Sequence, residues 1–271
     1  MGLDGKVVLV VGAGSGIGAA VAAQAAAAGA RVVVSGRRRE ALEKVAAATG
    51  ATAHPADVTV RDEVEALVAA VVQEHGRLDG VVASAGVITA GKVLDIGDQE
   101  WESALRTNLT SVFLLARAAL PHLIEARGAL VTVGSIAGHR AAAGSAAYAA
   151  SKAGAEVLTS TIAAEYGPLG VRANTVCPGW TRTEMADEEM REFGEPHGLD
   201  VEEAYAQATA LVPQRRAAEP GEIADAVLWL LGPRSSYVNG TVLTVDGGTT
   251  AVDPGTVPLD FGLAPRGPLS P

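Results

Sequence analysis

The sequence predicts an α/β protein with a doubly wound parallel sheet of about seven strands and helices on both faces. Short apolar runs rich in valine alternate with alanine-rich stretches along most of the chain. Such alternation, with short connections, is typical of parallel strands joined by right-handed crossover helices. Of the 271 residues, 48% are hydrophobic and only 4% are aromatic, which suits small side chains packed tightly on a buried sheet.

The expected elements follow one another in a regular order. The apolar run at 6–11, then a glycine-rich turn and a strong helix former, is the first unit of strand, turn and helix. The expected strands are 6–11, 31–35, 52–53, 78–83, 129–133, 171–176 and 241–245, and the expected helices are 19–28, 40–48, 61–74, 98–126, 146–166 and 222–231.

Two segments depart from this rhythm. Residues 179–215 carry polar and acidic residues around a few large apolar ones, and this length is more typical of a functional lid than of a connector. Residues 253–271 are rich in proline and glycine, so we expect an irregular tail there. The chain is therefore expected to form one domain over residues 1–252, including the lid.

Charge and cysteine content exclude several classes of protein. The net charge of -10 gives no electrostatic reason to bind nucleic acid or an anionic membrane. Cys177 is the only cysteine, so no internal disulfide can form, and we expect a buried, unreactive thiol. Residues 1–6 lack the layout of a signal peptide and no apolar run reaches the length of a membrane span, so we expect a cytoplasmic protein.

A glycine-rich turn, GAGSGIG, lies between the first strand and its helix. Gly12, Gly14, Gly16 and Gly18 would let the backbone turn sharply and approach a pyrophosphate on the helix N-terminus. Glycines also occur in turns for conformational reasons alone, so this motif needs further support.

Tyr148 and Lys152 lie four residues apart, which places both side chains on one face of a helix. A free tyrosine titrates near pH 10, so a cation one turn away would help it to act near neutrality. Ser135, 13 positions earlier at a strand end, could donate a hydrogen bond to a substrate oxygen. Taken alone, such a pair is more often the surface of an amphipathic helix.

Together these motifs resemble the short-chain dehydrogenase/reductase family, including its 3-oxoacyl-reductase-like members. Asn108, Ser135, Tyr148 and Lys152 occur in the order of the family's catalytic tetrad, behind the glycine turn. The resemblance implies an NAD(P)-binding Rossmann fold. The resemblance to the family extends from Lys6 to about Gly248. Besides the tetrad, it includes the spacing of GAGSGIG, Ala85-Gly86 after the fourth strand, NLT at Asn108, CPG at 177–179 and DGG at 246–248.

The resemblance implies hydride transfer between a nicotinamide and a ketone or secondary alcohol. Tyr148 would be the general acid in reduction and the base in oxidation. Lys152 would lower its pKa and bind the nicotinamide ribose, Ser135 would polarise the substrate, and Asn108 would anchor a water in the proton relay. No metal is expected, because the histidines and Cys177 show no ligand spacing and the cofactor supplies the redox chemistry.

The resemblance also indicates which cofactor binds. Gly36 stands where an acid would repel a 2′-phosphate, and Arg37 follows it, so we expect NADP(H) rather than NAD(H). Arg38 and Arg39 could simply begin a helix, and Asp57 could form a turn instead of contacting adenine. The expected cofactor contacts are Gly12, Ser15, Gly16, Ile17, Gly18, Arg37, Asp57, Val58, Ser84, Ala85, Gly86, Tyr148, Lys152, Pro178, Gly179, Thr181 and Thr183, of which the last two could instead cap the next helix.

The expected substrate pocket lies between Ser135 and Tyr148 and in the lid. Small alanines would leave space beside Trp180 and the lid methionines, which is consistent with a hydrophobic or cyclic ketone. Several of these side chains could instead pack the lid onto the body, and His139 could be an ordinary loop histidine. The pocket residues that we single out are Ile136, His139, Trp180 and Met185.

Two residues depart from the family pattern. Val11 stands in place of the usual threonine, and Ser84 replaces the asparagine of the common Asn-Ala-Gly motif. Hydrogen bonds that brace the central sheet are therefore expected to be lost or rerouted, without a direct effect on catalysis.

Two other functions remain open at this point. Some relatives reduce 3-oxoacyl groups on a carrier protein, but Ala126 and Leu169 stand where basic residues would meet that acidic partner, although Arg127 is adjacent. We therefore favour a freely diffusing carbonyl or alcohol. The third possibility is a catalytically silent, cofactor-sensing protein on the same fold. The family also often assembles as homotetramers or homodimers through the two long helices.

Overall fold

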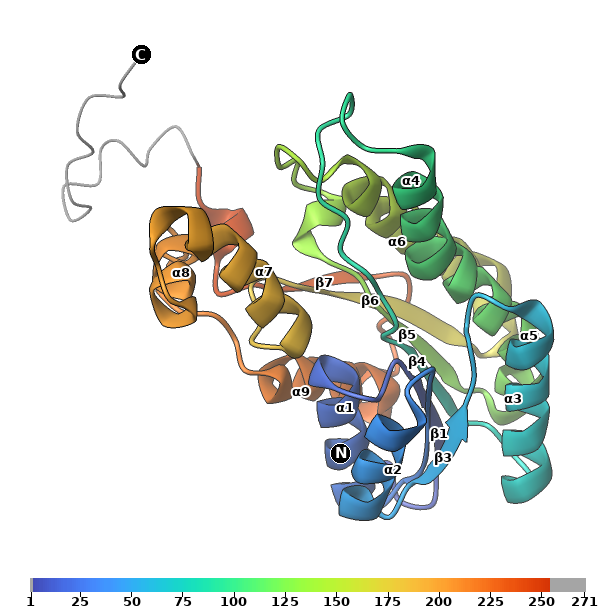
Figure 1. The fold of residues 1–271 in the computed structure, drawn as a ribbon. Coiled ribbons are helices and arrows are strands. Elements are labelled where there is room, and N and C mark those ends of the chain that lie inside the picture. The colour runs from blue at the N-terminus through green and yellow to red at the C-terminus, as the bar shows by residue number, and fades with distance from the viewer. Residues whose placement is uncertain (1, 254–271) are drawn as a thin grey trace.

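Seven parallel strands form one sheet in the order β3-β2-β1-β4-β5-β6-β7 (Figure 1). The computed structural model describes residues 2–253; the C-terminal tail predicted at 253–271 therefore lies outside the described residues except for Asp253. This architecture confirms the predicted doubly wound α/β fold. The strands are β1 (Val7–Val11), β2 (Arg31–Gly36), β3 (Thr52–Pro55), β4 (Gly80–Ala83), β5 (Ala129–Val133), β6 (Arg172–Pro178) and β7 (Val242–Val245).

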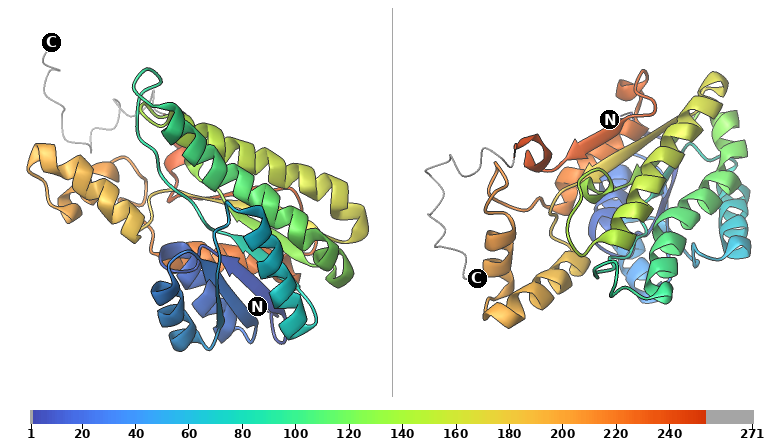
Figure 2. Two further views of the ribbon diagram at one scale, coloured as in Figure 1. Left: turned by 45° about the vertical axis from the view of Figure 1, so that its right-hand side comes forward. Right: turned by 90° about the horizontal axis from the view of Figure 1, so that it is seen from above.

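Helices cover both faces of the sheet, as Figures 1 and 2 show. On one face, apolar residues of α1, α2 and α9 pack together with alternate residues of the central strands. On the other face α3, α5 and α6 do the same. The α-helices of the described residues are α1 (Gly16–Ala27), α2 (Arg39–Thr49), α3 (Arg61–His75), α4 (Asp98–Leu105), α5 (Ser111–Ala126), α6 (Ala146–Tyr166), α7 (Glu184–Gly194), α8 (Val201–Ala208) and α9 (Pro220–Leu231).

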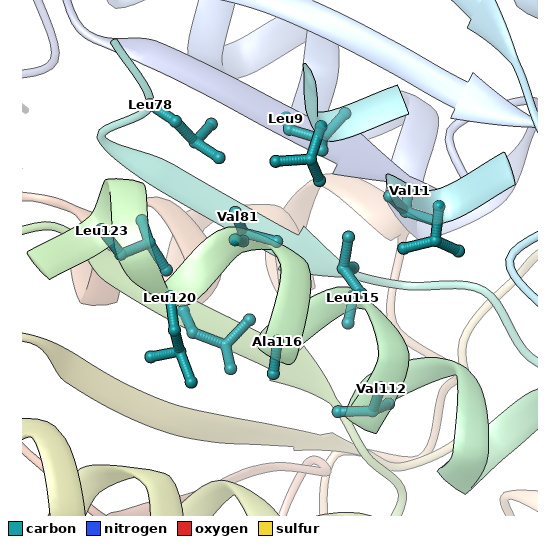
Figure 3. Packing of buried hydrophobic residues seen from close by; sticks show 14 of the residues in the cluster. Leu9, Val11, Leu78, Val81, Val112, Leu115, Ala116, Leu120 and Leu123 are labelled. Atoms are coloured by element: carbon teal, nitrogen blue, oxygen red, sulfur yellow. The ribbon is translucent and has the colours of Figure 1, made fainter. Parts of the chain in front are cut away.

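The two-residue period of β1 explains this division. Leu9 and Val11 lie in the same buried cluster as Leu115 of α5 (Figure 3). Val8 and Val10 face the opposite helices. Every residue of β1 is buried, because the strand lies in the middle of the sheet with helices on both sides.

The glycine turn after β1 packs directly against the end of β4. Gly12 has a φ of +81°, and a Cβ at this position would overlap the backbone of Ala85. A Cβ at Gly18 would overlap the carbonyl of Gly12 in the same way. Only glycine allows this approach, which occurs where the strand order reverses and a crevice opens beyond the strand ends.

Some element bounds differ from those predicted. Helix α1 begins at Gly16 rather than at residue 19, so that the last two glycines of the motif lie in its first turn. The helical region 98–126 contains a π-helical turn, Arg106–Thr110, between α4 and α5. The segment 179–215 folds into α7 and α8, which stand away from the body in both views of Figure 2.

The helix 98–126 is also long and apolar enough to cross a membrane by length and composition, contrary to the expectation that no such run exists. In the structure, however, its apolar residues pack on β4, α3 and α6. Such packing is typical of a core helix of a globular domain.

One buried hydroxyl in β2 has no partner. Ser35 Oγ is fully buried and makes no hydrogen bond within the described part of the chain. Ser35 pairs in register with Val11, the position where the family usually has threonine. A hydroxyl on the neighbouring strand would therefore be well placed to bond with it.

We predict that Val11→Thr raises the free energy of unfolding by about 0.5–1 kcal/mol, because the new hydroxyl would satisfy Ser35 Oγ. Urea-induced unfolding would measure the change. In a Ser35→Ala background the same substitution should lower stability, since the threonine hydroxyl would then be the unpaired group. A loss of stability in both backgrounds would contradict the prediction.

Candidate active site

A cavity of about 1330 Å³ lies beyond the carboxyl ends of the strands. The turn after β1 and the loops after β2 and β4 form one part of its wall, and the loop after β5 and helix α7 form the other. All of the predicted cofactor contacts line this cavity, as do Ser135, Ile136, Trp180 and Met185. Asn108 and His139 are not among the lining residues.

The N-terminus of α1 is suited to binding an anion. Its N-cap, Ser15, makes no side-chain capping bond, and its first turn carries no acidic residue. The first backbone N–H groups of the helix and its positive dipole end therefore point toward the cavity without a side-chain partner. A Cβ at Gly16 would lie only 3.0 Å from a methyl group of Thr183. The absence of side chains thus leaves a cradle that fits a pyrophosphate.

Arg37 and Arg38 both line the end of the cavity near β2. Arg38 Nη2 donates to Ser15 Oγ at 2.9 Å, and its guanidinium also pairs with Glu184 at 3.1 Å. Arg38 is the N-cap of α2, in agreement with the alternative that it begins a helix. Its contact with Glu184 spans 146 residues, so the local sequence pattern did not reveal its place at the cavity.

Asp57 forms a turn and also lines the cavity. Its carboxylate accepts hydrogen bonds from the backbone N–H and the hydroxyl of Thr59, at 2.9 Å and 2.7 Å. Burial alone would raise the pKa of Asp57, but the bonds from Thr59 and the charge of Arg37 lower it overall. The side chain is therefore a stable anion, and both interpretations of Asp57 in the sequence agree with its position.

Tyr148 lies in the first turn of α6, facing Ser135 at the end of β5. Burial raises the pKa of the phenol, and the hydrogen bond with Ser135 opposes this shift only in part. Because Ser135 Oγ also accepts a bond from Ala137 N at 3.2 Å, its orientation is fixed by the loop after β5. The structure thus holds a protonated phenol beside a second hydroxyl.

Lys152 is buried one helical turn beyond Tyr148. Its Nζ donates to the carbonyl of Val133 at 2.9 Å and lies 5.8 Å from the centre of the Tyr148 ring. Burial lowers the pKa of Lys152 to about 8, against the influence of Cys177 and Glu156. The ammonium is therefore still mostly charged at neutral pH.

Asn108 lies in the π-helical turn and joins three parts of the site. Its Oδ1 accepts from the N–H of Val87 at 2.9 Å. Its Nδ2 donates to the carbonyl of Val87 at 2.9 Å and to Ser151 Oγ at 3.0 Å. The side chain thus fixes the loop after β4 to α6, close to Tyr148 and Lys152.

His139 lies elsewhere than the sequence analysis expected for a pocket residue. Its Nδ1 is 3.4 Å from Glu156, whose other oxygen accepts from Cys177 Sγ at 3.2 Å. These three groups lie within 4.8 Å of one another, although their sequence spacing gave no sign of it. Burial raises the pKa of the Cys177 thiol, as expected for an unreactive cysteine. The contacts among His139, Glu156 and Cys177 connect the loop after Ser135 to α6 and β6.

The segment 179–215, which we expected to form a lid, contributes one wall of the cavity. Trp180, Met185, Met190 and Phe193 line it from this side, opposite the alanines at 141–143. Thr183 Oγ1 caps α7 by accepting from Ala186 N at 3.1 Å, which agrees with the capping alternative for this residue. Cavity residues that sequence reasoning missed include Arg38, Thr89, Arg140, Glu184 and Glu189.

Comparison with known proteins identifies the family. The family model described as "Enoyl-(Acyl carrier protein) reductase" matches residues 12–250. The chain is 41% identical over 247 residues to protein MoaE of Klebsiella aerogenes, covering 90% of this chain and 95% of that protein. It is 34% identical over 254 residues to the 3-oxoacyl-[acyl-carrier-protein] reductase FabG of Thermotoga maritima, covering 92% and 99%.

A solved structure gives the same result. A variant of actinorhodin polyketide ketoreductase with NADPH superimposes with a TM-score of 0.87 at 34% identity, covering 93% of this chain and 100% of that one. The sheet, the motifs and these similarities agree with one another. The chain therefore belongs to the short-chain dehydrogenase/reductase family of NAD(P)-binding oxidoreductases and resembles its 3-oxoacyl reductases.

Proposed function

We propose that this protein transfers a hydride between NADP(H) and a ketone or secondary alcohol, with Tyr148 as the general acid and base. The observation that carries the proposal is the meeting of Tyr148, Ser135 and Lys152 on one wall of the cavity. The open N-terminus of α1 lies on the same cavity, so one dinucleotide could extend from the helix to the phenol. We treat residues 1–252 as one catalytic unit in which 179–215 is the lid.

The chain's own residues would position the substrate and move its proton, while the bound nicotinamide would supply or accept the hydride. The hydroxyls of Ser135 and Tyr148 would both donate to the carbonyl oxygen. Because burial keeps the phenol protonated at neutral pH, Tyr148 can give its proton to this oxygen in reduction. The charge of Lys152 would then stabilise the phenolate, and alcohol oxidation would run the same transfer backwards.

Two arginines support NADP(H) as the cofactor. Arg37 and Arg38 line the cavity beside Gly36, and the turn after β2 offers no carboxylate to repel a 2′-phosphate. Guanidinium groups hold phosphate oxygens through charge-assisted pairs of hydrogen bonds. The similar ketoreductase with NADPH supports the same assignment.

The substrate that we propose is a freely diffusing small molecule. Arg127, the basic residue next to the expected carrier contacts, ends α5 just before β5 and so lies at the edge of the sheet opposite the cavity. The lid beside the cavity instead carries acidic residues, which would repel an acidic carrier. A carrier-bound acyl chain is the alternative that a substrate comparison would test.

We also propose that the protein acts in the cytoplasm as a homodimer or homotetramer. Helices α5 and α6 present the exposed apolar side chains of Phe113 and Val157. A second copy could cover such side chains in a symmetric interface. Light scattering on the purified protein would give the assembly size.

Replacing Tyr148 by phenylalanine should reduce kcat with NADPH and a ketone by about 10²- to 10⁴-fold, because the proton donor is lost. Binding of NADPH, followed by its fluorescence, should be unchanged. The fully exposed Tyr237 supplies a control, since Tyr237→Phe should leave turnover intact. A wild-type protein that binds NADPH without turning over any ketone would indicate the sensing alternative, and turnover of acyl thioesters alone would indicate the carrier-bound one.

The burial of Lys152 should make it unfavourable for stability. A folded-state pKa of about 8 in place of the ordinary 10.5 corresponds to a penalty of about 3 kcal/mol at neutral pH. The penalty is complete below pH 8 and disappears as pH rises through 8 to 10.5, because the lysine is then neutral in both states.

Lys152→Met should therefore raise the free energy of unfolding at pH 7 by about 1–2 kcal/mol. This gain is smaller than the full penalty because the Val133 carbonyl loses its hydrogen bond. The variant should also lose turnover. Thermal unfolding between pH 7 and 10.5 would show the gain shrinking as pH rises. Lys44→Met, at an exposed lysine paired with Glu40, is the matched control and should change little. Equal stability of Lys152→Met and the wild type at pH 7 would contradict the assigned cost.

Removing either arginine should weaken the preference for the phosphorylated cofactor. Arg37→Ala and Arg38→Ala should each lower kcat/KM for NADPH by about 10- to 100-fold, the loss of a charge-assisted phosphate contact, with a much smaller effect for NADH. Arg39, which pairs with Glu43 and is not among the cavity residues, gives a control variant. Unchanged NADPH-to-NADH ratios in both variants would rule out these contacts.

A further inference from the structure

Helix α7 presents an apolar face to the cavity that is interrupted by one acid. Met185, Ala186, Met190 and Phe193 line the cavity at the spacing of a single helix face. Glu189 lies among them and lines the same cavity, which also contains Tyr148 and Ser135. Desolvation of a carboxylate in an apolar wall is unfavourable unless a cation or hydrogen-bond donor pairs with it.

Three of the four other acids of α7 have partners inside the protein, and the fourth, Glu192, is exposed and does not line the cavity. Glu184 pairs with Arg38, Asp187 accepts from the hydroxyl of Tyr205 at 2.8 Å, and Glu188 pairs with Arg191. The side chain of Glu189 is partly buried at the cavity, and we find no hydrogen bond or ion pair to it within residues 2–253. The acid on the cavity face is thus left for something that enters the cavity.

The electrostatics of the pocket lead to the same conclusion. Burial raises the pKa of Glu189, and the charge of the nearby Glu192 raises it further. The negative charge of Glu189 in turn raises the pKa of Tyr148, so the two groups interact across the pocket. A cation bound at Glu189 would oppose the upward pKa shifts of both Glu189 and Tyr148.

The surrounding side chains suit an organic ammonium rather than a hydrated metal ion. Trp180 and Phe193 line the same cavity, and aromatic faces attract ammonium groups. Met185 and Met190 offer soft apolar contacts for the carbon skeleton. Two arginines of the lid are engaged elsewhere, since Arg182 pairs with Glu202 and Arg191 with Glu188.

We propose that Glu189 binds a protonated amine of the substrate, which makes amino ketones and the corresponding amino alcohols the preferred substrate class. The inference rests on the proposed function, because it assumes that the carbonyl lies at Tyr148 and Ser135. The ammonium then lies across the pocket from the reacting carbon, between the carboxylate of Glu189 and the lid aromatics. Carboxylate-bearing ketones of the same size are repelled by the same group.

The test compares matched ketones at pH 7: an amino ketone, its N-acetylated form and its carbon isostere. With NADPH, the wild type should favour the amine at least tenfold in kcat/KM, mainly through a lower KM. Glu189→Gln should remove this preference, so that the amino ketone and its carbon isostere are reduced with similar kcat/KM. Glu188→Gln, one residue away on the outer side of α7, is the matched control and should keep the preference.

Each result decides one question. A wild type that reduces all three ketones equally, or favours the N-acetylated form, overturns the ammonium site but leaves the proposed function intact. Retention of the preference in Glu189→Gln also overturns it, with thermal unfolding used to show that the variant is folded. Because the comparison among ketones needs only the wild type, it remains decisive even if the variant does not fold. Absence of turnover with every ketone would instead contradict the proposed function.

Discussion

The contact between Gly12 and the backbone at Ala85 is the constraint on which the site depends. It joins the turn after β1 to the end of β4 with no side chain between them. Because β1, β4 and β5 are neighbours in the sheet, this contact also sets where α1 begins relative to Ser135. An anion-binding helix terminus and a pair of hydroxyls thereby share one cavity. Any residue larger than glycine at position 12 would separate the two halves.

Local sequence patterns were sufficient for the parts of the structure that depend on local geometry. The two-residue period of β1 and the four-residue spacing of Tyr148 and Lys152 depend on strand and helix geometry alone. The family resemblance then ordered these parts correctly, as the match over residues 12–250 confirms. The fold could therefore be predicted almost completely, and the positions lining the cavity largely so.

The rest depends on contacts between distant segments. Arg38 reaches the cavity because the lid brings Glu184 to it, and His139 turns away because Glu156 lies on the neighbouring helix. Glu189 could not be distinguished in the sequence from the other lid acids, since all belong to one acidic run. The difference arises from which side of α7 faces the body, and that is fixed by packing within the lid.

Residues 186–217 contain a small hydrophobic core of their own. Met190 and Tyr205 are almost fully buried, and Ala186, Ala204 and Ala217 complete a cluster separate from the two cores on the sheet. A unit that keeps its internal packing can swing as one piece, with little loss of buried apolar surface at the sheet. Local opening of this unit is therefore expected to have a free energy different from that of global unfolding, which amide exchange in α7 and α8 would measure.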